Sequence, residues 1–344
     1  MHSRYRKQSF FHGLGESGQE RLESARVVLI GCGALGSVMA DTLVRAGVGY
    51  VRLIDRDFVD LSNLQRQVLY DEDDVAQRLP KVIAAQRKLQ RVNSLVEIEA
   101  HVEDVSAANI LELIDGCELI LDGTDNFEVR YLINDASLET GTPWINGGCV
   151  GAHGQVMPIF PGRTPCLRCL MPEIPEPGST ETCDTAGVIG PAVNVIASLQ
   201  ATEALKILSG QLELVEPALT VVDVWEGTWR RMKLQQPDLR EHCPACSQGE
   251  RLWLSGHRGG QSVVLCGRNS VQIAPGERLR SSLKEMADRL RQVGTVRETP
   301  FLLVFAPASS DEIEVTLFSD GRAIISGTDD PARARTLYAQ YVGA

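Results

Sequence analysis

Short apolar segments alternate with amphipathic ones along the first part of the chain. Arg26–Ile30 is a β-branched run typical of a buried strand, apolar residues recur at helical spacing over Ala34–Ala46, and Tyr50–Ile54 is a second strand-like run. The same pattern predicts helices near residues 80–91, 107–115 and 125–139, and strands near residues 96–100, 118–122 and 143–146. Strands that alternate with helices of this length indicate βαβ units. The sequence therefore predicts an α/β fold with a Rossmann-like, doubly wound, mostly parallel sheet.

The pattern changes after residue 147. A strand near 154–160, an apolar helix near 189–208 and a hairpin near 218–234 predict an extension of this first domain. Beyond residues 247–250, strand-like segments (262–266, 301–305), a hairpin (314–326) and helix-like segments (279–293, Pro331–Tyr341) predict a small C-terminal α+β domain. We therefore expect domains over residues 1–248 and 251–344. For the second domain we predict partner recognition or regulation, with a purely stabilising appendage as the alternative.

The charge balance limits the classes of partner that this chain is expected to bind. Among 344 residues, 45 are Asp or Glu and 34 are Lys or Arg, which gives a net charge of −11. Because nucleic-acid affinity is built mainly from Lys and Arg, this acidic excess argues against nucleic-acid binding. The sequence contains no run of about 20 apolar residues that would span a membrane, and its N-terminus lacks the apolar segment of a secretory signal. We expect a cytoplasmic protein.

A glycine-rich loop joins the first strand to the first helix. It reads GCGALG, with Gly31, Gly33 and Gly36 in a Gly-x-Gly-x-x-Gly arrangement. The first two glycines let the backbone turn and approach a phosphate, the third allows helix and strand to pack closely, and the helix N-terminus supplies amide donors. Asp55, at the end of the second strand, is placed to bind ribose hydroxyls. This context predicts an adenine nucleotide and leaves NAD, FAD and ATP open.

Charged and polar residues follow at the ends of later elements. Asn63 and Arg66 lie three residues apart in SNLQRQ, Lys81 lies just inside the start of a helix, and Asp125 belongs to the DGTDN segment after a strand. Two cations and a carboxylate suit a triphosphate with magnesium, because Arg and Lys bind phosphate oxygens and Asp binds the metal. A hydride-transfer enzyme does not need this set. ATP and Mg²⁺ are therefore the predicted cofactors, and an NAD(P)-dependent oxidoreductase is the alternative.

Four of the nine cysteines form two Cys-x-x-Cys pairs. Cys166 with Cys169 and Cys243 with Cys246 together predict a four-thiolate structural Zn²⁺ site. The other interpretations of such pairs are a redox disulfide and a coincidence of spacing. The pairs lie further apart than the two halves of a zinc ribbon, so the fold must bring them together.

The order of these motifs resembles that of the ubiquitin-activating-enzyme superfamily. The glycine loop, LIDRD with Asp55, SNLQRQ, the helix at Lys81, DGTDN and the two cysteine pairs follow one another as in its bacterial MoeB/ThiF (HesA/MoeB/ThiF) branch, over about residues 4–246. The resemblance implies an ATP-dependent adenylyltransferase. Such an enzyme joins the C-terminal glycine carboxylate of a ubiquitin-like sulfur-carrier protein to AMP and releases pyrophosphate, in molybdopterin, thiamine or related thio-cofactor biosynthesis.

The resemblance also implies roles for single residues. Asp55 would bind ribose, Asn63, Arg66 and Lys81 would bind phosphates, and Asp125 would serve the magnesium-dependent chemistry. Similar proteins carry both cysteine pairs in this order, and this likeness strengthens the zinc interpretation.

The family further uses an N-terminal arginine that is contributed across a homodimer. At the matching position this chain has Lys7, which keeps the charge but lacks the bidentate guanidinium, and Arg6 is the neighbouring alternative. We therefore expect a homodimer. A non-catalytic carrier-binding scaffold is a further alternative function, and Lys7 is its only support.

Cys183, in the ETCDTAG segment before the long apolar helix, is a candidate nucleophile. A thiol on a loop near a helix N-terminus can be reactive. In ThiF and the eukaryotic relatives, the matching cysteine forms a thioester or an acyl disulfide with the carrier. An unreactive loop thiol is the alternative interpretation. Cys266 lies in no recognisable catalytic motif and is expected in the core.

Overall fold

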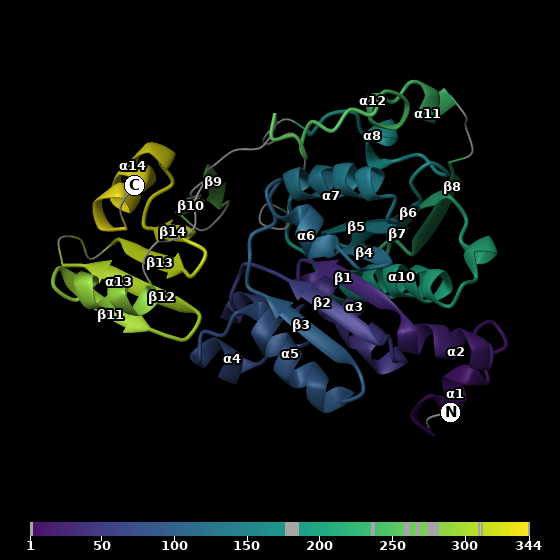
Figure 1. The fold of residues 1–344 in the computed structure, drawn as a ribbon, viewed down its shortest axis with the longest axis horizontal. Coiled ribbons are helices and arrows are strands. Elements are labelled where there is room, and N and C mark those ends of the chain that lie inside the picture. The colour runs from purple at the N-terminus through teal and green to yellow at the C-terminus, as the bar shows by residue number, and fades with distance from the viewer. Residues whose placement is uncertain are drawn as a thin grey trace. The chain divides into compact units, whose positions relative to one another are not determined.

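The computed structural model describes residues 3–175, 186–234, 238–257, 262–265, 269–273, 282–308, 310 and 312–342. The chain divides into two compact units, Met1–Arg258 and Gly259–Ala344. Each unit has its own sheet (Figure 1). Among the described helices, none combines the length and the apolar character that crossing a membrane would require.

An eight-stranded sheet forms the centre of the first unit, in the order β3-β2-β1-β4-β5-β6-β7-β8. The five strands β3 to β5 in this order pair in parallel, and β6, β7 and β8 continue the sheet with antiparallel pairing. The predicted doubly wound, mostly parallel sheet is thereby confirmed. The strands are β1 (Arg26–Ile30), β2 (Tyr50–Ile54), β3 (Glu97–His101), β4 (Leu119–Asp122), β5 (Trp144–Val150), β6 (His153–Ile159), β7 (Ala218–Asp223) and β8 (Thr228–Lys233).

Helices cover both faces of this sheet. Figure 1 shows α6 and α7 on one face and α3, α5 and α10 on the other. Strands β1 and β4 between them are buried almost completely, which explains their continuous apolar runs. The helices are α1 (Arg6–Ser9), α2 (Gly15–Ser24), α3 (Ala34–Ala46), α4 (Glu72–Ala76), α5 (Lys81–Val92), α6 (Ile110–Ile114), α7 (Phe127–Thr140), α8 (Leu167–Leu170), α10 (Gly190–Leu208), α11 (Asp238–Glu241) and α12 (Pro244–Ser247), with 3-10 turns at Ser3–Tyr5, Leu61–Asn63 and Leu212–Leu214.

Strand β5 is longer than its predicted range, residues 143–146. Gly147 and the residues after it continue the strand because they pair antiparallel with β6. A side chain at Gly147 would collide with the amide of Gln200, a fully buried residue of α10. Glycine at position 147 is therefore required for the close approach of α10.

The second unit contains a six-stranded antiparallel sheet in the order β11-β12-β13-β14-β10-β9. Its two helices contribute Met286 and Tyr338 to a core with Phe305, Leu317 and Ile325 from the strands. The sequence did not reveal β10 and β11, which are short. The elements are β9 (Ser262–Leu265), β10 (Ser270–Ile273), α13 (Leu283–Leu290), β11 (Gly294–Glu298), β12 (Leu302–Pro307), β13 (Glu314–Phe318), β14 (Ala323–Ser326) and α14 (Pro331–Tyr341).

The chain between the second cysteine pair and the second unit packs on α7. The backbone N–H of Trp253 donates to Asp135 Oδ2 over 2.9 Å, and its ring centroid lies 4.5 Å from that of Tyr131. Arg251 Nε lies 3.3 Å from Glu139 Oε2. Residues 251–257, which we expected at the start of the second domain, thus belong to the packing of the first unit.

Candidate active site

The glycine loop turns at the carboxyl end of β1 and packs against the loop that follows β4. Gly31 has φ +87°, and a side chain there would lie 2.8 Å from the Gly123 backbone. A side chain at Gly36 would collide with the Gly31 carbonyl, whereas one at Gly33 would meet only Gln67 Nε2, at 3.8 Å. Packing within the protein therefore requires glycine at 31 and 36. At Gly33 the bare backbone has room beside it, as an approaching phosphate needs.

Asp55 follows β2 and holds the glycine loop. Its Oδ2 accepts a hydrogen bond from Cys32 N over 2.7 Å, and its Oδ1 accepts one from Asp57 N over 2.7 Å. Burial raises the pKa of this carboxyl, and the ammonium of Lys81 opposes the rise. The half-buried side chain lies where the sequence predicted a ribose-binding carboxylate.

Lys81 is the first residue of α5 and its side chain is only 6% exposed. Its Nζ lies 3.0 Å from Asp57 Oδ2. Burial disfavours the charge, but the carboxylates of Asp57, Asp55 and Asp125 outweigh burial and raise the pKa of Lys81 above its ordinary value. The structure therefore favours the charged ammonium of Lys81, which lies near three carboxylates at the carboxyl edge of the sheet.

The polar side chains of the DGTDN loop after β4 make hydrogen bonds that stabilise the loop and the start of α7, except that of Asp125. Asp122 accepts hydrogen bonds from Thr124, and Asn126 caps the first turn of α7. Asp125 is exposed and makes no hydrogen bond or ion pair with any residue in the described part of the chain. Its carboxylate nevertheless acts on the charge of Lys81. A carboxylate left free at this edge has the donor chemistry that Mg²⁺ prefers.

The SNLQRQ segment lies against the glycine loop. Asn63 ends a 3-10 turn, is 2% exposed, and accepts a hydrogen bond from Asp60 N through its Oδ1. Arg66 Nη1 donates to Ser62 O over 2.9 Å. Shortly after this segment, Tyr70 Oη donates to Cys32 O over 2.6 Å. Both predicted phosphate-binding residues of this segment thus lie on one short turn that borders the loop.

The sequence assigned no separate role to three residues that shape the site, Asp122, Gly123 and Arg130. Gly123 packs its backbone against Gly31, and Asp122 forms a buried ion pair with Arg130 of α7. Within the DGTDN motif only Asp125 is assigned a role from the sequence, and the spacing of eight residues from Asp122 to Arg130 gives no signal of its own. Only the fold shows that the loop and the helix meet.

Arg6 and Lys7 lie far from the glycine loop of their own chain. They belong to α1, where Gln8 Nε2 donates to Ala46 O, at the last residue of α3. The glycine loop precedes the first residue of α3, and a helix of 13 residues is about 20 Å long. Neither cation can therefore reach the nucleotide site of the same chain.

Cys183 lies outside the described residues. The described chain resumes at residue 186, where the Val188 carbonyl accepts a hydrogen bond from Gln65 Nε2 over 3.5 Å. A side chain at Gly190 would lie 3.1 Å from Gln65 O. The segment that follows Cys183 is thus joined to SNLQRQ. Cys266 also lies outside the described residues.

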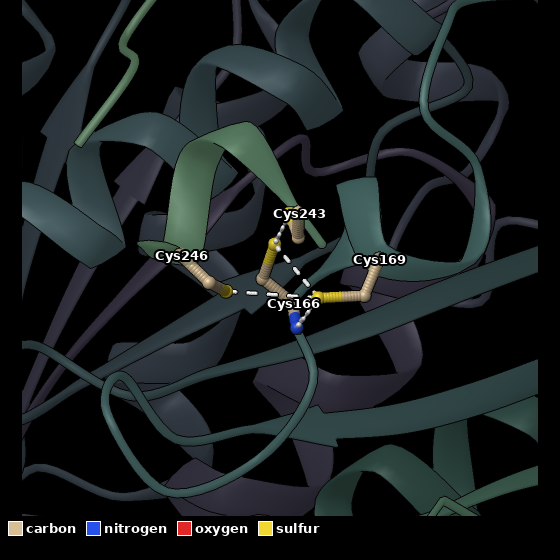
Figure 2. A group of neighbouring side chains, drawn as sticks. All are labelled: Cys166, Cys169, Cys243 and Cys246. Atoms are coloured by element: carbon tan, nitrogen blue, oxygen red, sulfur yellow. Dashed lines mark hydrogen bonds between the residues drawn. The ribbon is translucent and has the colours of Figure 1, made fainter. Parts of the chain in front are cut away.

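The two cysteine pairs lie close together, each pair at the start of a short helix. Cys166 precedes α8 and Cys243 precedes α12, and their Sγ atoms lie 3.7 Å apart. Cys169 Sγ lies 3.8 Å from Cys166 Sγ and 3.6 Å from Cys246 Sγ. Figure 2 shows the four side chains pointing toward a common centre. All four sulfurs lie within 4.8 Å of one another, so they could hold a metal ion.

Together, an open parallel sheet, a glycine loop at its carboxyl edge and charged side chains beside the loop define a nucleotide-binding α/β protein. A protein-family model, the ThiF family, matches residues 5–245. The chain belongs to the ThiF family, which confirms the resemblance drawn from its motifs.

Relatives of known name agree with this assignment. A sulfur carrier protein ThiS adenylyltransferase from Bacillus subtilis (strain 168) is 45% identical over 345 residues, covering 100% of both chains. A sulfur carrier protein adenylyltransferase from Thermus thermophilus is 40% identical over 248 residues, 71% of this chain and 90% of that protein. The crystal structure of E. coli MccB with MccA-N7isoASN superposes with a TM-score of 0.62 at 24% identity, over 71% of this chain and 74% of the other, and shows the shared fold.

Proposed function

We propose that this chain is an adenylyltransferase that activates the C-terminal glycine carboxylate of a ubiquitin-like sulfur-carrier protein with ATP. The main observation behind this proposal is the edge of the large sheet. There the buried ammonium of Lys81 and the carboxylate of Asp125, which has no hydrogen-bond or ion-pair partner among the described residues, border an open glycine loop. The family supports the reaction, and the full-length relative named for ThiS makes a ThiS-type carrier the first substrate to test.

The charges of the site offset the electrostatic repulsion that opposes this reaction. The carrier's carboxylate is a weak nucleophile, and it must approach the α-phosphate although both are anionic. The amides of the glycine loop and the cations of Lys81 and Arg66 neutralise phosphate charge, and binding converts the encounter into an oriented one. Asp125 would hold Mg²⁺, which neutralises further charge on the triphosphate when bound.

The four-cysteine cluster would hold a structural zinc ion. Four sulfurs at about 2.3 Å from a central Zn²⁺ lie about 3.8 Å apart in a tetrahedron. Three of the separations, Cys166–Cys243, Cys166–Cys169 and Cys169–Cys246, are 3.6 to 3.8 Å and fit this geometry, and all four sulfurs lie within 4.8 Å of one another. Four thiolates leave no ligand position open, as is typical of a site that stabilises the fold. Reduced thiols also fit a cytoplasmic location.

A homodimer would complete the nucleotide site. Because Arg6 and Lys7 cannot reach the glycine loop of their own chain, either cation can act only at the site of a second copy. Lys7 occupies the position of the family's arginine and is the first candidate.

Cys183 would form a covalent intermediate with the activated carrier. Its thiolate would attack the acyl-adenylate carbonyl, form a thioester and release AMP. We expect Cys183→Ala to abolish the thiol-sensitive carrier–enzyme conjugate on a non-reducing gel while ATP–pyrophosphate exchange continues at the wild-type rate. Cys149→Ala is the matched control, since this half-buried thiol lies on β5. Undiminished conjugate in Cys183→Ala would remove the nucleophile assignment.

The second unit has a role separate from adenylation. The T. thermophilus relative aligns over 90% of its own length with only 71% of this chain, so it has no room for a unit of this size. The B. subtilis relative matches throughout. We assign the second unit to recognition or regulation of a partner rather than to the nucleotide chemistry.

The deciding experiment is carrier-dependent exchange of labelled pyrophosphate into ATP. The proposal predicts exchange with a ThiS-type carrier and none with a carrier that lacks its C-terminal glycine. The oxidoreductase alternative predicts instead that NADH fluorescence changes on binding. A folded chain that binds NADH and shows no exchange would overturn the proposal. A scaffold without catalysis would bind the carrier and show no exchange.

A further inference from the structure

Thr124, the residue before Asp125, is held by two charged side chains. Its backbone N–H and its hydroxyl donate to Asp122 Oδ1 over 2.9 and 2.7 Å. Its carbonyl accepts a hydrogen bond from Arg130 Nη2 over 2.6 Å. Hydrogen bonds to ionised groups are shorter and stronger than those between neutral groups. All the polar groups of Thr124 are therefore fixed.

The two charged residues are themselves fixed by neighbouring elements. Arg130 Nε lies 3.3 Å from Asp122 Oδ2, and Asn146 Nδ2 donates to the same oxygen over 3.0 Å. Gln200 Nε2 donates to the Asp122 carbonyl over 2.8 Å. Asp122 is fully buried and the Arg130 side chain is 12% exposed. β4, β5, α7 and α10 thus meet in one polar network.

Stability alone does not account for this network. A buried ion pair is often no more stabilising than apolar side chains of the same volume, because both charges lose their hydration. Its better-attested contribution is to fix one arrangement of the chain. Here the network fixes the backbone on both sides of Asp125. Thr124, before it, is bound to Asp122, and Asn126, after it, caps α7. Its carboxylate is left exposed, at the edge that carries Lys81.

We propose that Asp122, Thr124 and Arg130 are positioning residues that hold the Asp125 carboxylate in the orientation in which it binds a divalent cation. Arg130 also neutralises Asp122, so the buried carboxylate does not add its charge to that of Asp125. This inference rests on the proposed function, which assigns the cation to Asp125. None of the three residues needs to contact the nucleotide or the carrier.

The test compares two substitutions at Thr124. Thr124→Val keeps the shape and loses the hydroxyl, and Thr124→Ser keeps the hydroxyl. We measure Mn²⁺ affinity in the presence of a non-hydrolysable ATP analogue, from the electron paramagnetic resonance signal of free Mn²⁺. Thr124→Val should weaken Mn²⁺ binding about tenfold, because a hydrogen bond to a charged group is lost. Thr124→Ser should bind Mn²⁺ like the wild type.

Arg130→Lys keeps the charge and loses the planar fork, so it should also weaken Mn²⁺ binding, and it tests the inference should Thr124→Val not fold. Wild-type Mn²⁺ affinity in either folded variant, with only a lower melting temperature, would overturn the inference. Carrier-dependent exchange in the wild-type chain is measured separately. Its absence would overturn the proposed function, while the Mn²⁺ titration would still decide whether these residues position Asp125.

Discussion

The carboxyl edge of the large sheet and the four-cysteine cluster lie in the same unit and are built in opposite ways. At the edge, side chains from several loops are fixed by their neighbours, and Asp125 is left exposed without a partner in the described structure. In the cluster, the four sulfurs contact one another, and Cys166 and Cys243 are buried. This difference fits the proposal that the edge receives an exchangeable ligand and that the cluster would keep a permanent one. The following predictions test this division or show which other parts of the chain the edge depends on.

The largest effect is expected from Asp125→Ala. Removing a group that stabilises charge at a reaction centre typically costs about 10²- to 10³-fold in rate. The melting temperature should change little, because Asp125 is exposed and makes no hydrogen bond or ion pair with a described residue. Glu128→Ala, which removes an exposed carboxylate one turn away, should retain activity. Carrier-dependent pyrophosphate exchange measures both, and a large loss in Glu128→Ala would show that general surface charge is responsible.

The cluster should affect stability more than chemistry. Cys243→Ser removes one of four ligands, and structural zinc sites contribute several kcal/mol or more to folding. We expect about one zinc per wild-type chain by elemental analysis and a marked loss of metal and of melting temperature in the variant. Cys117→Ser, at a buried cysteine outside the cluster, should retain the metal. Full metal content in Cys243→Ser would refute the four-ligand assignment.

Substitutions at two glycines of the same loop should have different effects on protein stability and on ATP binding. Gly36→Ala places a side chain against the Gly31 carbonyl, and such overpacking costs about 1–3 kcal/mol. Gly33→Ala meets no protein atom closer than 3.8 Å, so it should leave stability nearly unchanged and weaken ATP binding. Thermal melting and isothermal titration with ATP measure the two effects. The same loss of ATP affinity at unchanged stability in both variants would contradict the division.

The smallest effect on exchange is expected from removing the second unit. Ending the chain after residue 258 preserves Trp253 and its contacts with α7, which a cut at residue 248 would remove. Exchange should continue at the wild-type rate in the shorter chain, while binding to the partner of the second unit should be lost. Loss of exchange in a truncated chain that melts at the wild-type temperature would assign the second unit to adenylation.

The sequence predicted elements better than it predicted contacts between loops. Period and turn residues located α3, β2 and α10 closely, because these patterns are local. The cysteine pairs could be predicted from spacing, yet only the fold brings them together across the intervening chain. α2 escaped prediction because it contains a single large apolar residue, Leu22, and one such residue gives no helical period. The ion pair between Arg130 and Asp122 depends on how α7 packs against the loop that precedes it, and no local sequence pattern predicts that packing.

The central claim is that the edge of the large sheet transfers AMP to the carrier's terminal carboxylate. Mass spectrometry of an intact ThiS-type carrier, after incubation with the chain, ATP and Mg²⁺, tests it most directly. The account predicts a carrier species heavier by one AMP with the wild-type chain and none with Asp125→Ala. A folded wild-type chain that binds ATP and carrier but forms no adenylated carrier would contradict it.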